Sequence, residues 1–416
     1  MSQTYISHNG KRTVQQLPVP ARKGHNAILK ANYIEDTIKA MGEWSCERVV
    51  LVYPKALDAN TNVVSKLKEK LGHFIVGKKA GVGAHSPYQD VLEITNLLNE
   101  KKADCLLSVG SSSYSDACKI ARLMQMNLNP QDLTSEAMEA LVDQEKGTVD
   151  DLKDPTTRLI LVPTSLSASE WNSESSATNP ITQKKQHFSS PNAAPDLILL
   201  DPEVASTSPR KLWLASGMRA VDHCIETMVN NQCKCDAFYH MEDALTVLLK
   251  GLKDCREGEN KNDQNELING IHQCQIGSRN AMMGLLLWSI PMGTSHAIGH
   301  QLGSICGVMH GVTSCIILAP VLRYTSERND KQKEVQGKVL KIWNKILKTD
   351  EKTLADAVEN IVKMLDLPKT LKEIGITKDD DIDRVAESTL TDVFGAQEGL
   401  VGNKDQILQI LNMARG

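Results

Sequence analysis

Short apolar runs alternate with amphipathic stretches between about residues 45 and 204. Helical spacing of the apolar positions predicts helices at residues 62–71, 89–101 and 115–124. Between and around them, continuous apolar runs predict buried strands at residues 48–53, 74–76, 105–109, 159–163 and 197–200. Strand and helix in alternation predict an α/β domain with a doubly wound, Rossmann-like parallel sheet, whose ligands bind beyond the carboxyl ends of the strands.

After about residue 202 the strand pattern fades and helical periodicity takes over. Helices are predicted near residues 210–230, 236–253, 267–287, 331–347, 354–364 and 380–394, with the polar residues 259–266 as a solvated loop. The pattern therefore divides the chain into an α/β domain, residues 1–204, and an all-helical domain, residues 205–416.

Composition narrows the class of partner. The 416 residues carry a net charge of -4, which argues against nucleic acid or an anionic membrane as the main partner. Ten cysteines without C-x-x-C pairs, and a polar beginning without an apolar leader, predict a cytoplasmic protein with reduced thiols. We therefore expect a small-molecule ligand.

Three of the eleven histidines, His296, His300 and His310, lie in the stretch SHAIGHQLGSICGVMHG. His296 and His300 stand four apart, which places them on one face of a helix. An unbroken helix would put His310 roughly 21 Å from His296. A shared site therefore needs a turn at Gly303 or Gly307, and two buried histidines of an ordinary helix are the alternative.

A second stretch, GMRAVDHCIE, holds Arg219 and His223 four apart on one helical face. Asp222 precedes His223 directly and is expected to face away from it, because neighbours on a helix point about 100° apart. A guanidinium has no lone pair, so Arg219 cannot ligate a metal ion and would repel one.

Together the two stretches resemble the iron-containing, or group III, alcohol dehydrogenase family, in which one Asp and three His hold a divalent ion such as iron or zinc. The resemblance implies that His223, His296 and His310 stand at three ligand positions, and that Arg219 stands where the family has its Asp. This incomplete set predicts an enzyme that works without the metal. The family counterpart of His300 lies near the nicotinamide and the substrate, which makes His300 the candidate proton donor.

The stretch GSSSYSDACK follows the predicted strand at residues 105–109. A helix that opens on glycine and serines offers free N–H groups and a positive dipole end to a phosphate, although a serine-capped helix needs no ligand. The stretch resembles the family's pyrophosphate loop, with two serines in place of glycines. The resemblance implies contact with a dinucleotide for these residues of the loop: Gly110, Ser111, Ser112, Ser113, Asp116 and Lys119.

Two further stretches bear on the cofactor. Thr164, Ser165 and Ser167 belong to PTSLSASEW, whose small hydroxyl residues suit a loop beside a nucleotide. After the first predicted strand, NAD-preferring relatives place an Asp that binds the adenosine ribose. Here Pro54 takes that place and Lys55 follows, which favours NADPH without excluding NADH. His85, in GVGAHSPY, matches a His that the family carries near the cofactor.

The short form of PTSLSASEW and the missing Asp resemble the maleylacetate reductase branch of the family. The resemblance implies an NAD(P)H-dependent oxidoreductase that transfers hydride to a small carbonyl or unsaturated keto acid. It also implies that the protein forms a homodimer. Arg219, beside the histidines, would polarise the acceptor or bind a substrate carboxylate. The alternative from another class is a cofactor-free lyase, isomerase or dehydratase that uses the same histidines and Arg219. A binding protein without catalysis is the third alternative.

Overall fold

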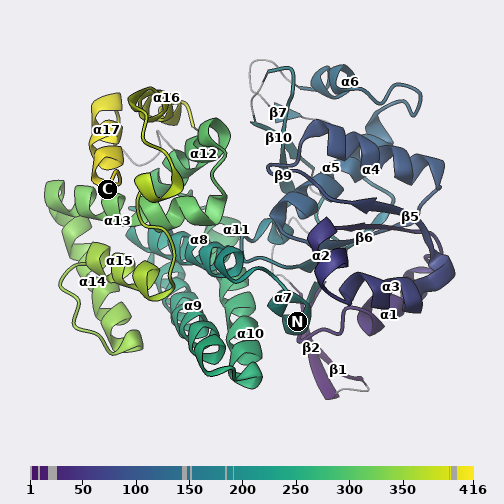
Figure 1. Cartoon of the computed structure of the whole chain (residues 1–416), viewed down its shortest axis with the longest axis horizontal. Helices are drawn as coiled ribbons and strands as arrows, with labels where there is room; N and C mark the ends of the chain where they lie inside the picture. The colour runs from purple at the N-terminus through teal and green to yellow at the C-terminus, as the bar shows by residue number, and fades with distance from the viewer. Residues whose placement is uncertain are drawn as a thin grey trace. The chain divides into compact units, whose positions relative to one another are not determined.

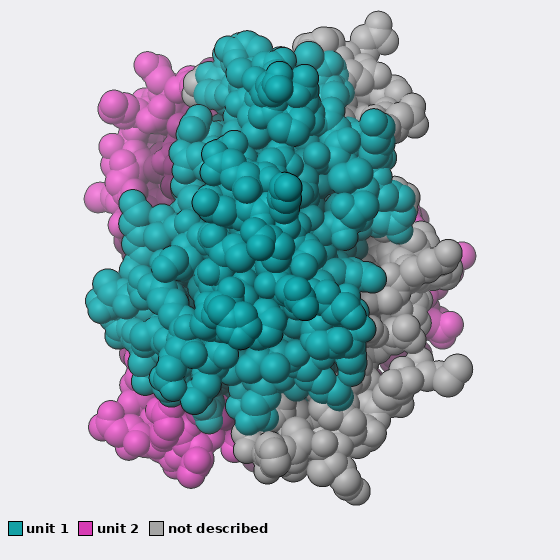
Figure 2. Space-filling model, turned by 90° about the vertical axis from the view of Figure 1, so that its right-hand side faces the viewer, with its two compact units in different colours: residues 1–208 teal, residues 209–416 magenta. Residues whose placement is uncertain are grey.

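The computed structural model describes residues 2–7, 10–16, 26–142, 148–149, 152–182, 185–190, 192–392, 394 and 401–416. The chain divides into two compact units, Met1–Ser208 and Pro209–Gly416, which Figure 2 colours separately. Figure 1 shows that the first unit is built around a β-sheet and the second from helices.

The main sheet has the strand order β1-β2-β3-β11-β8-β6-β4-β5 among the described residues. Its parallel members are β3 (Asn26–Leu29), β4 (Val49–Tyr53), β5 (Ile75–Ala80), β6 (Cys105–Gly110), β8 (Arg158–Pro163) and β11 (Leu197–Leu200). A hairpin of β1 (Ser2–Ser7) and β2 (Gly10–Gln16) continues the sheet antiparallel at one edge. The predicted doubly wound parallel sheet is confirmed, and the sequence missed only its β1 to β3 edge.

Helices cover both faces of this sheet (Figure 1). Val50 and Val52 of β4 pack into the cluster formed with α4 (Tyr88–Glu100) and α5 (Ser112–Asn127). Their neighbours Val49 and Leu51 pack into the opposite cluster, which is formed with α1 (Glu35–Trp44), α2 (Lys55–Asn60) and α3 (Val63–Leu71). Burial on both faces is why the strands read as continuous apolar runs rather than alternating ones.

The structure contains a second sheet that was not predicted from the sequence. It has the order β7-β10-β9, formed by β7 (Thr148–Val149), β10 (Lys185–Ser189) and β9 (Glu174–Thr178). The strands ESSAT and KQHFS hold few apolar residues, so no strand was predicted from them. The remaining short elements of the first unit are η1 (Gly72–Phe74), α6 (Ser135–Glu139), η2 (Ser169–Trp171) and α7 (Pro202–Ser206).

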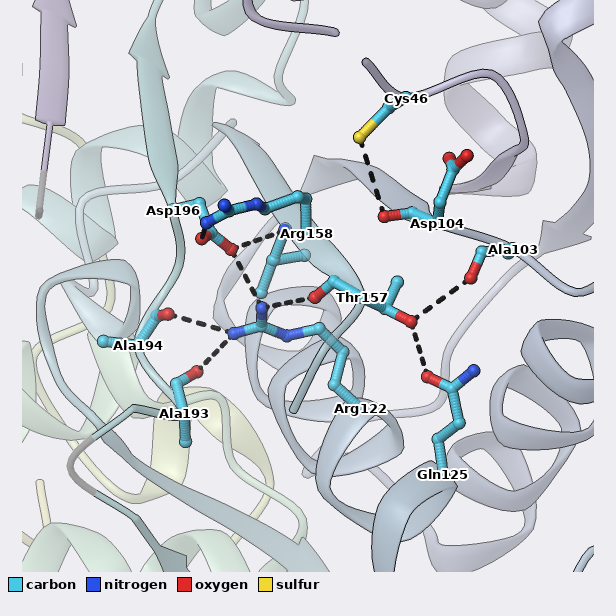
Figure 3. A network of polar contacts seen from close by, with 11 residues as sticks. Cys46, Ala103, Asp104, Arg122, Gln125, Thr157, Arg158, Ala193, Ala194 and Asp196 are labelled. Carbon is cyan, nitrogen blue, oxygen red and sulfur yellow. Dashed lines mark hydrogen bonds and ion pairs between the residues drawn. The ribbon is translucent and has the colours of Figure 1, made fainter. Parts of the chain in front are cut away.

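A buried arginine ties together the amino ends of the strands (Figure 3). Arg122 of α5 donates to Asp196 over 3.0 Å, and to the backbone carbonyls of Thr157, Ala193 and Ala194. Asp196 also pairs with the half-exposed Arg158 at 2.7 Å. Thr157 precedes β8 and Asp196 precedes β11, so this network lies at the amino ends of the strands. Ligands of such sheets bind at the opposite, carboxyl ends.

The second unit contains α8 (Arg210–Val229), α9 (Cys235–Lys261), α10 (Gln264–Ala281), α11 (Met283–Trp288), α12 (Thr294–Cys306), α13 (His310–Arg328), α14 (Asp330–Leu347), α15 (Leu354–Met364), η3 (Lys372–Ile374), α16 (Asp379–Thr389) and α17 (Lys404–Met413). The predicted helical character of this part is confirmed. One predicted helix, residues 380–394, was too long, because α16 ends at Thr389 and the chain then turns.

The predicted loop at residues 259–266 was wrong. Helix α9 continues to Lys261 and α10 begins at Gln264, so only two residues connect them. Asn262 adopts a left-handed conformation with φ 53°, and the Asp263 side chain accepts hydrogen bonds from the first N–H groups of α10. The charged residues that suggested a loop instead form exposed helix ends. No helix of the described part of the chain is both long and apolar enough to cross a membrane.

Candidate active site

In the first unit, three of the predicted cofactor stretches follow the carboxyl ends of neighbouring strands. The chain passes from β4 to β5 on one side and then to β6 on the other, so the strand order reverses between β4 and β6. Open α/β sheets bind ligands beyond the carboxyl ends of the strands at such a reversal. Pro54 follows β4, Ser111 follows β6 and Thr164 follows β8. The Thr164 N–H donates to the Gly110 carbonyl over 3.0 Å, which joins two of the stretches directly.

The loop after β6 has open donors at the start of α5. The first N–H groups of a helix have no acceptor within the helix, and Ser111 is the N-cap without a side-chain hydrogen bond. The buried Ser112 Oγ has no hydrogen-bond partner among the described residues. These open groups fit the phosphates of a dinucleotide. Gly110 is required for packing, because a Cβ there would lie 2.5 Å from the Tyr114 ring.

Lys119 and Asp116 lie beneath this loop rather than at its surface. The fully buried Lys119 ammonium donates to the carbonyls of Ser169, Asn172 and Glu174 over 2.8, 3.1 and 2.8 Å. It also lies 3.2 Å from Asp116, which accepts a hydrogen bond from the Ser169 hydroxyl. An ammonium has three N–H groups, so these oxygens occupy it. Both residues therefore hold PTSLSASEW against α5, where Thr164 and Ser165 are buried and Ser167 is half-buried.

The side chain of Lys55 lies across Gly81, at the carboxyl ends of β4 and β5. A Cβ at Gly81, whose φ is +92°, would come 3.2 Å from Lys55 Cε. Lys55 is exposed and directly follows Pro54, the N-cap of α2. A flexible cation is thus available where the first strand ends.

His85 and Ser86 form a strained turn beside the loop between β6 and α5. Their φ values are 60° and 51°, a conformation that side chains other than glycine rarely adopt. The buried Ser86 hydroxyl donates to the Ser113 carbonyl over 2.9 Å, and the His85 carbonyl accepts from the Thr178 N–H over 3.1 Å. The turn therefore braces the first turn of α5.

In the second unit, α8 carries a row of buried polar side chains. Every residue from 213 to 229 on this helix is buried, including Arg219, Asp222, His223 and Glu226. Buried polar groups need partners, and α12 and α13 provide them. Helix α12 ends at Cys306, and the next residue, Gly307, has a φ of +70° that lets the chain turn back into α13. The predicted turn at Gly307 is confirmed, whereas Gly303 lies inside α12.

Asp222, which was expected to face away from His223, lies against His296 of another helix. Its carboxylate is fully buried and lies 3.6 Å from Nδ1 of His296. The hydroxyls of Ser295 and Ser314 donate to Asp222 Oδ2 over 2.8 and 2.7 Å. The 100° angle between neighbours does separate Asp222 from His223 on α8, but α12 reaches both sides. The rings of His223 and His296 lie 4.8 Å apart.

Glu226 is a site residue that sequence reasoning missed. It accepts hydrogen bonds from the N–H groups of Gly293 and Ser295 over 2.8 and 2.7 Å, so it caps the start of α12 from another helix. Its Oε2 shares a 2.6 Å hydrogen bond with His296 Nδ1. The sequence signal that could have found it is the spacing of four residues from Asp222, which places the two carboxyl side chains on one face of α8.

Burial controls the charges of the carboxyl and imidazole groups on α8 and α12. It raises the pKa of Glu226 to about 7 against the opposing effect of hydrogen bonds from α12. Burial, together with the charge of Glu226, raises the pKa of Asp222 well above its usual range. Burial also lowers the pKa values of His223 and His296 well below the usual range, helped for both by the charge of Arg219. Both imidazoles are therefore neutral at physiological pH.

Arg219 is buried beside these carboxylates, yet most of its donors are open. Its side chain is 6% exposed, and its one hydrogen bond among the described residues is a 3.4 Å contact from Nη1 to the Ser314 hydroxyl. Gly299 makes room for the guanidinium, because a Cβ there would lie 3.3 Å from Nη1. Burial lowers the pKa of Arg219, and the carboxylates of Asp222 and Glu226 oppose that shift. The guanidinium is thus held in place by charge with donors left for a ligand.

The family resemblance implies a divalent ion, and two of the side chains that could hold one are hydrogen-bonded to each other in this structure. Asp222, Glu226 and His296 offer ligand atoms within 4.8 Å of one another among the described residues. However, two ligands of one tetrahedral ion, each about 2.1 Å from it, lie roughly 3.4 Å apart. The 2.6 Å separation of Glu226 Oε2 and His296 Nδ1 is a hydrogen bond instead. Arg219 adds a positive charge where the resemblance places a carboxylate.

The other two predicted histidines, His300 and His310, lie beside each other. The rings of His300 and His310 lie 5.8 Å apart, and His310 is the first residue of α13. His300 Nδ1 lies 3.1 Å from the carboxylate of Asp392, which the sequence did not single out. The buried atoms His223 Nδ1, His296 Nε2 and Asp222 Oδ1 have no hydrogen-bond partner within the described part of the chain. Like Arg219, they leave polar capacity for a ligand.

The chain combines a doubly wound α/β unit with a helical unit that holds a buried histidine cluster, and comparison with known proteins gives the family. A model described as "Iron-containing alcohol dehydrogenase" matches residues 25–202, and one described as "Fe-containing alcohol dehydrogenase family, C-terminal" matches residues 213–415. The chain belongs to this family and is an oxidoreductase.

Individual relatives agree with this assignment. Dehydrogenase ALT3 of Alternaria alternata is 30% identical over 398 residues, which cover 88% of this chain and 99% of that protein. The fold resembles NADH-dependent butanol dehydrogenase A of Thermotoga maritima, with a TM-score of 0.77, 18% identity, and coverage of 97% and 98%. Maleylacetate reductase of Agrobacterium tumefaciens has a TM-score of 0.72, 17% identity, and coverage of 96% and 98%.

Proposed function

We propose that the chain is an NAD(P)H-dependent reductase of a small carbonyl or unsaturated keto acid, in which Arg219 takes the place of the divalent ion. Residues 1–204 would bind the cofactor, and residues 205–416 would activate the substrate. The single observation that carries the proposal is the state of Arg219. It is 6% exposed and uses one of the five N–H groups of a guanidinium in a weak hydrogen bond.

The bound reduced nicotinamide supplies a hydride to the acceptor carbon. Negative charge then develops on the acceptor oxygen, and a buried guanidinium aimed at that oxygen stabilises it. The same fork can hold a substrate carboxylate through two N–H groups. The oxygen also needs a proton, which we assign to His300. His223 and His296 have lowered pKa values, so they are neutral, and they would line the site beside Arg219 and offer hydrogen bonds.

The cofactor preference that we propose is NADPH over NADH. Pro54 brings no carboxylate to the end of β4, and the nearby Asp58 is already paired with Lys68 at 3.0 Å. Lys55 lies across the neighbouring loop as an exposed cation. A 2'-phosphate would therefore meet a positive side chain and no unpaired carboxylate of α2.

The activities for which two structural neighbours are named support a small carbonyl acceptor. Butanol dehydrogenase and maleylacetate reductase act, by name, on a short alcohol and on a carboxylated substrate respectively. A buried arginine suits the second kind of substrate, because a carboxylate can accept both arms of the guanidinium. We further propose that the protein is cytoplasmic and forms a homodimer, and light scattering of the purified protein would test the homodimer.

The first experiment compares wild type with Arg219→Ala and Arg219→Lys, using NADPH oxidation with a panel of aldehydes and keto acids. We expect Arg219→Ala to reduce kcat on the order of 100-fold or more, as loss of one donor to a developing oxyanion does elsewhere. Free guanidinium should restore part of the activity of Arg219→Ala and none to wild type. Circular dichroism controls for folding of each variant.

Metal analysis completes this experiment. We expect stoichiometric metal to be absent from active wild-type protein, and activity to survive dialysis against a chelator. Loss of activity on chelation with recovery on adding zinc or iron would overturn the metal-independent proposal while leaving the reductase intact.

The second candidate function is a non-redox lyase, isomerase or dehydratase. The observation in its favour is the buried Glu226–His296 pair, because a carboxyl whose pKa is about 7 suits acid–base work at neutral pH. Calorimetry separates the two candidates. If the folded protein binds neither NADPH nor NADH, the reductase fails and this second function takes its place.

A further inference from the structure

His300 has a carboxylate partner that lies 92 residues away in the sequence. Asp392 Oδ2 is 3.1 Å from His300 Nδ1 and also accepts from the Gln301 side-chain amide over 2.9 Å. Its other oxygen, Oδ1, accepts from the Phe394 backbone N–H over 3.0 Å. Both oxygens are thus held, so the carboxylate cannot rotate freely and meets His300 in one orientation.

The turn after α16 brings this carboxylate into a buried position. The Asp392 side chain is 6% exposed and that of His300 is 17% exposed. Burial works to raise the pKa of Asp392, but the hydrogen bond and charge of His300, together with the hydrogen bonds from Phe394 and Gln301, hold this pKa below its usual value. The carboxylate is therefore ionised at neutral pH, and its charge is directed at the His300 ring.

The same turn places an aromatic ring against the histidines. The centroid of the Phe394 ring lies 5.6 Å from that of His300 and 6.4 Å from that of His296. Apolar cover on one side and a fixed carboxylate on the other leave the imidazole of His300 little freedom to flip. This is the arrangement by which carboxylates fix the tautomer and orientation of functional histidines.

We propose that Asp392 is a positioning residue, which accepts the Nδ1–H of His300 and so makes Nε2 the atom that gives the proton to the substrate. This inference rests on the proposed reductase and adds a residue to it. In the step, the Nε2–H bond breaks and its electron pair stays on nitrogen, while a new O–H bond forms on the acceptor oxygen. The neutral imidazole left behind keeps its Nδ1–H on Asp392. Solvent then restores the proton at Nε2.

The test uses Asp392→Asn, which keeps the size of the side chain and removes the charge. We expect kcat to fall on the order of 10- to 100-fold, the usual cost of losing such a partner, with KM and NADPH affinity within about twofold of wild type. The solvent deuterium isotope effect on kcat should rise, because proton transfer becomes slower. Asp392→Glu, the conservative variant, should keep more activity than Asp392→Asn.

A second readout is independent of turnover. Long-range nitrogen–proton NMR spectra of histidine-labelled protein report the tautomer of each ring, with His300→Asn used to assign the signal of His300. At a pH high enough for the His300 ring to be neutral, we expect the remaining proton on Nδ1 in wild type and a mixture of tautomers in Asp392→Asn. The matched control is Asp380→Asn, an exposed aspartate on α16, which should change neither spectrum nor rate.

The outcomes separate this inference from the function on which it rests. An unchanged kcat and tautomer in a folded Asp392→Asn protein would overturn the positioning role. Wild-type turnover in His300→Asn would remove His300 as the proton donor, and with it that part of the proposed function. If Asp392→Asn does not fold, Asp392→Glu decides. If Asp392→Glu changes the tautomer of His300 but keeps the kcat and isotope effect of wild type, the tautomer does not control proton transfer and the proposal fails.

Discussion

Two buried cations, Lys119 and Arg219, differ in how their donors are used. The Lys119 ammonium is surrounded by three backbone carbonyls and Asp116, so it has no capacity left for a ligand. Arg219, which is also buried, makes one 3.4 Å hydrogen bond among the described residues. Because an unsatisfied buried cation is costly, this difference supports the proposal that Arg219 binds a ligand, whereas Lys119 stabilises the fold.

Glu170 gives a prediction at this scale. It is buried in the loop held by Lys119, and burial raises its pKa from 4.5 to about 7. A carboxyl with a raised pKa stabilises the folded state below pH 4.5, and this stability is lost as pH rises through 7. At 1.36 kcal/mol per pKa unit, the loss is about 3 kcal/mol.

Urea unfolding at pH 5 and pH 8 checks this expectation. Glu170→Gln should lose less stability than wild type across that range and be the more stable protein at pH 8. Glu69→Gln, on the exposed side of α3, serves as the control and should follow wild type. Parallel pH dependence of wild type and Glu170→Gln would show that Glu170 does not titrate there.

At the scale of elements, α9 and α10 form a hairpin whose backbones approach through glycine. A Cβ at Gly270 would lie 2.7 Å from the Cys255 backbone nitrogen and 2.8 Å from the Gly251 carbonyl oxygen. Backbone atoms cannot move aside as a flexible side chain does. We therefore expect Gly270→Ala to lower the free energy of unfolding by about 2 kcal/mol or more, as overpacking does.

Gly337 provides the matched control for this substitution. It lies within α14, and a Cβ there would meet nothing within 4 Å. Gly337→Ala should raise the free energy of unfolding by about 0.5–1 kcal/mol, because alanine favours the helix. Thermal unfolding of both variants measures the contrast. Equal effects at the two positions would mean that the hairpin tolerates a wider separation of its helices.

For the whole molecule, nucleotide binding should be visible as local protection of the backbone. We expect NADPH to slow amide hydrogen exchange in residues 53–55, 110–116 and 163–171, which follow β4, β6 and β8. Lys55→Ala should weaken NADPH binding about tenfold or more and leave NADH nearly unchanged, because only the former carries the 2'-phosphate.

Lys66→Ala, an exposed lysine of α3, controls for a general loss of positive charge. Equal losses for NADPH and NADH in Lys55→Ala would contradict the proposed preference. Protection at Lys119 alone, with none at the three strand ends, would place the nucleotide elsewhere in the first unit.

The prediction of the fold from sequence worked where one element alone produces the pattern. Strands β4, β6 and β11 are buried on both faces, so their apolar runs are continuous and local. Strands β9 and β10 carry polar residues and depend on pairing with each other, and no local pattern revealed them. The end of α16 was missed for the same reason, since Asp392 turns away from the helix toward His300.

The site was predicted only as far as helical spacing reaches. Spacing placed Arg219 and His223 on one face of α8 and suggested the turn at Gly307, and both features are found in the structure. Spacing could not show that α12 contacts two sides of α8, which brings Asp222 to His296. Nor could it reveal Glu226 as a cap of α12, because that role depends on where another helix begins.

The sequence by itself determined the class of fold, the family and the residue types of the site, because periodicity and short motifs are local properties of the chain. Only the tertiary structure decided the use of each polar group. Whether a buried cation is satisfied, as Lys119 is, or left with open donors, as Arg219 is, depends on atoms contributed by distant segments. Burial, which sets the charges of Glu226 and His296, is likewise a property of the packed unit and not of any stretch within it.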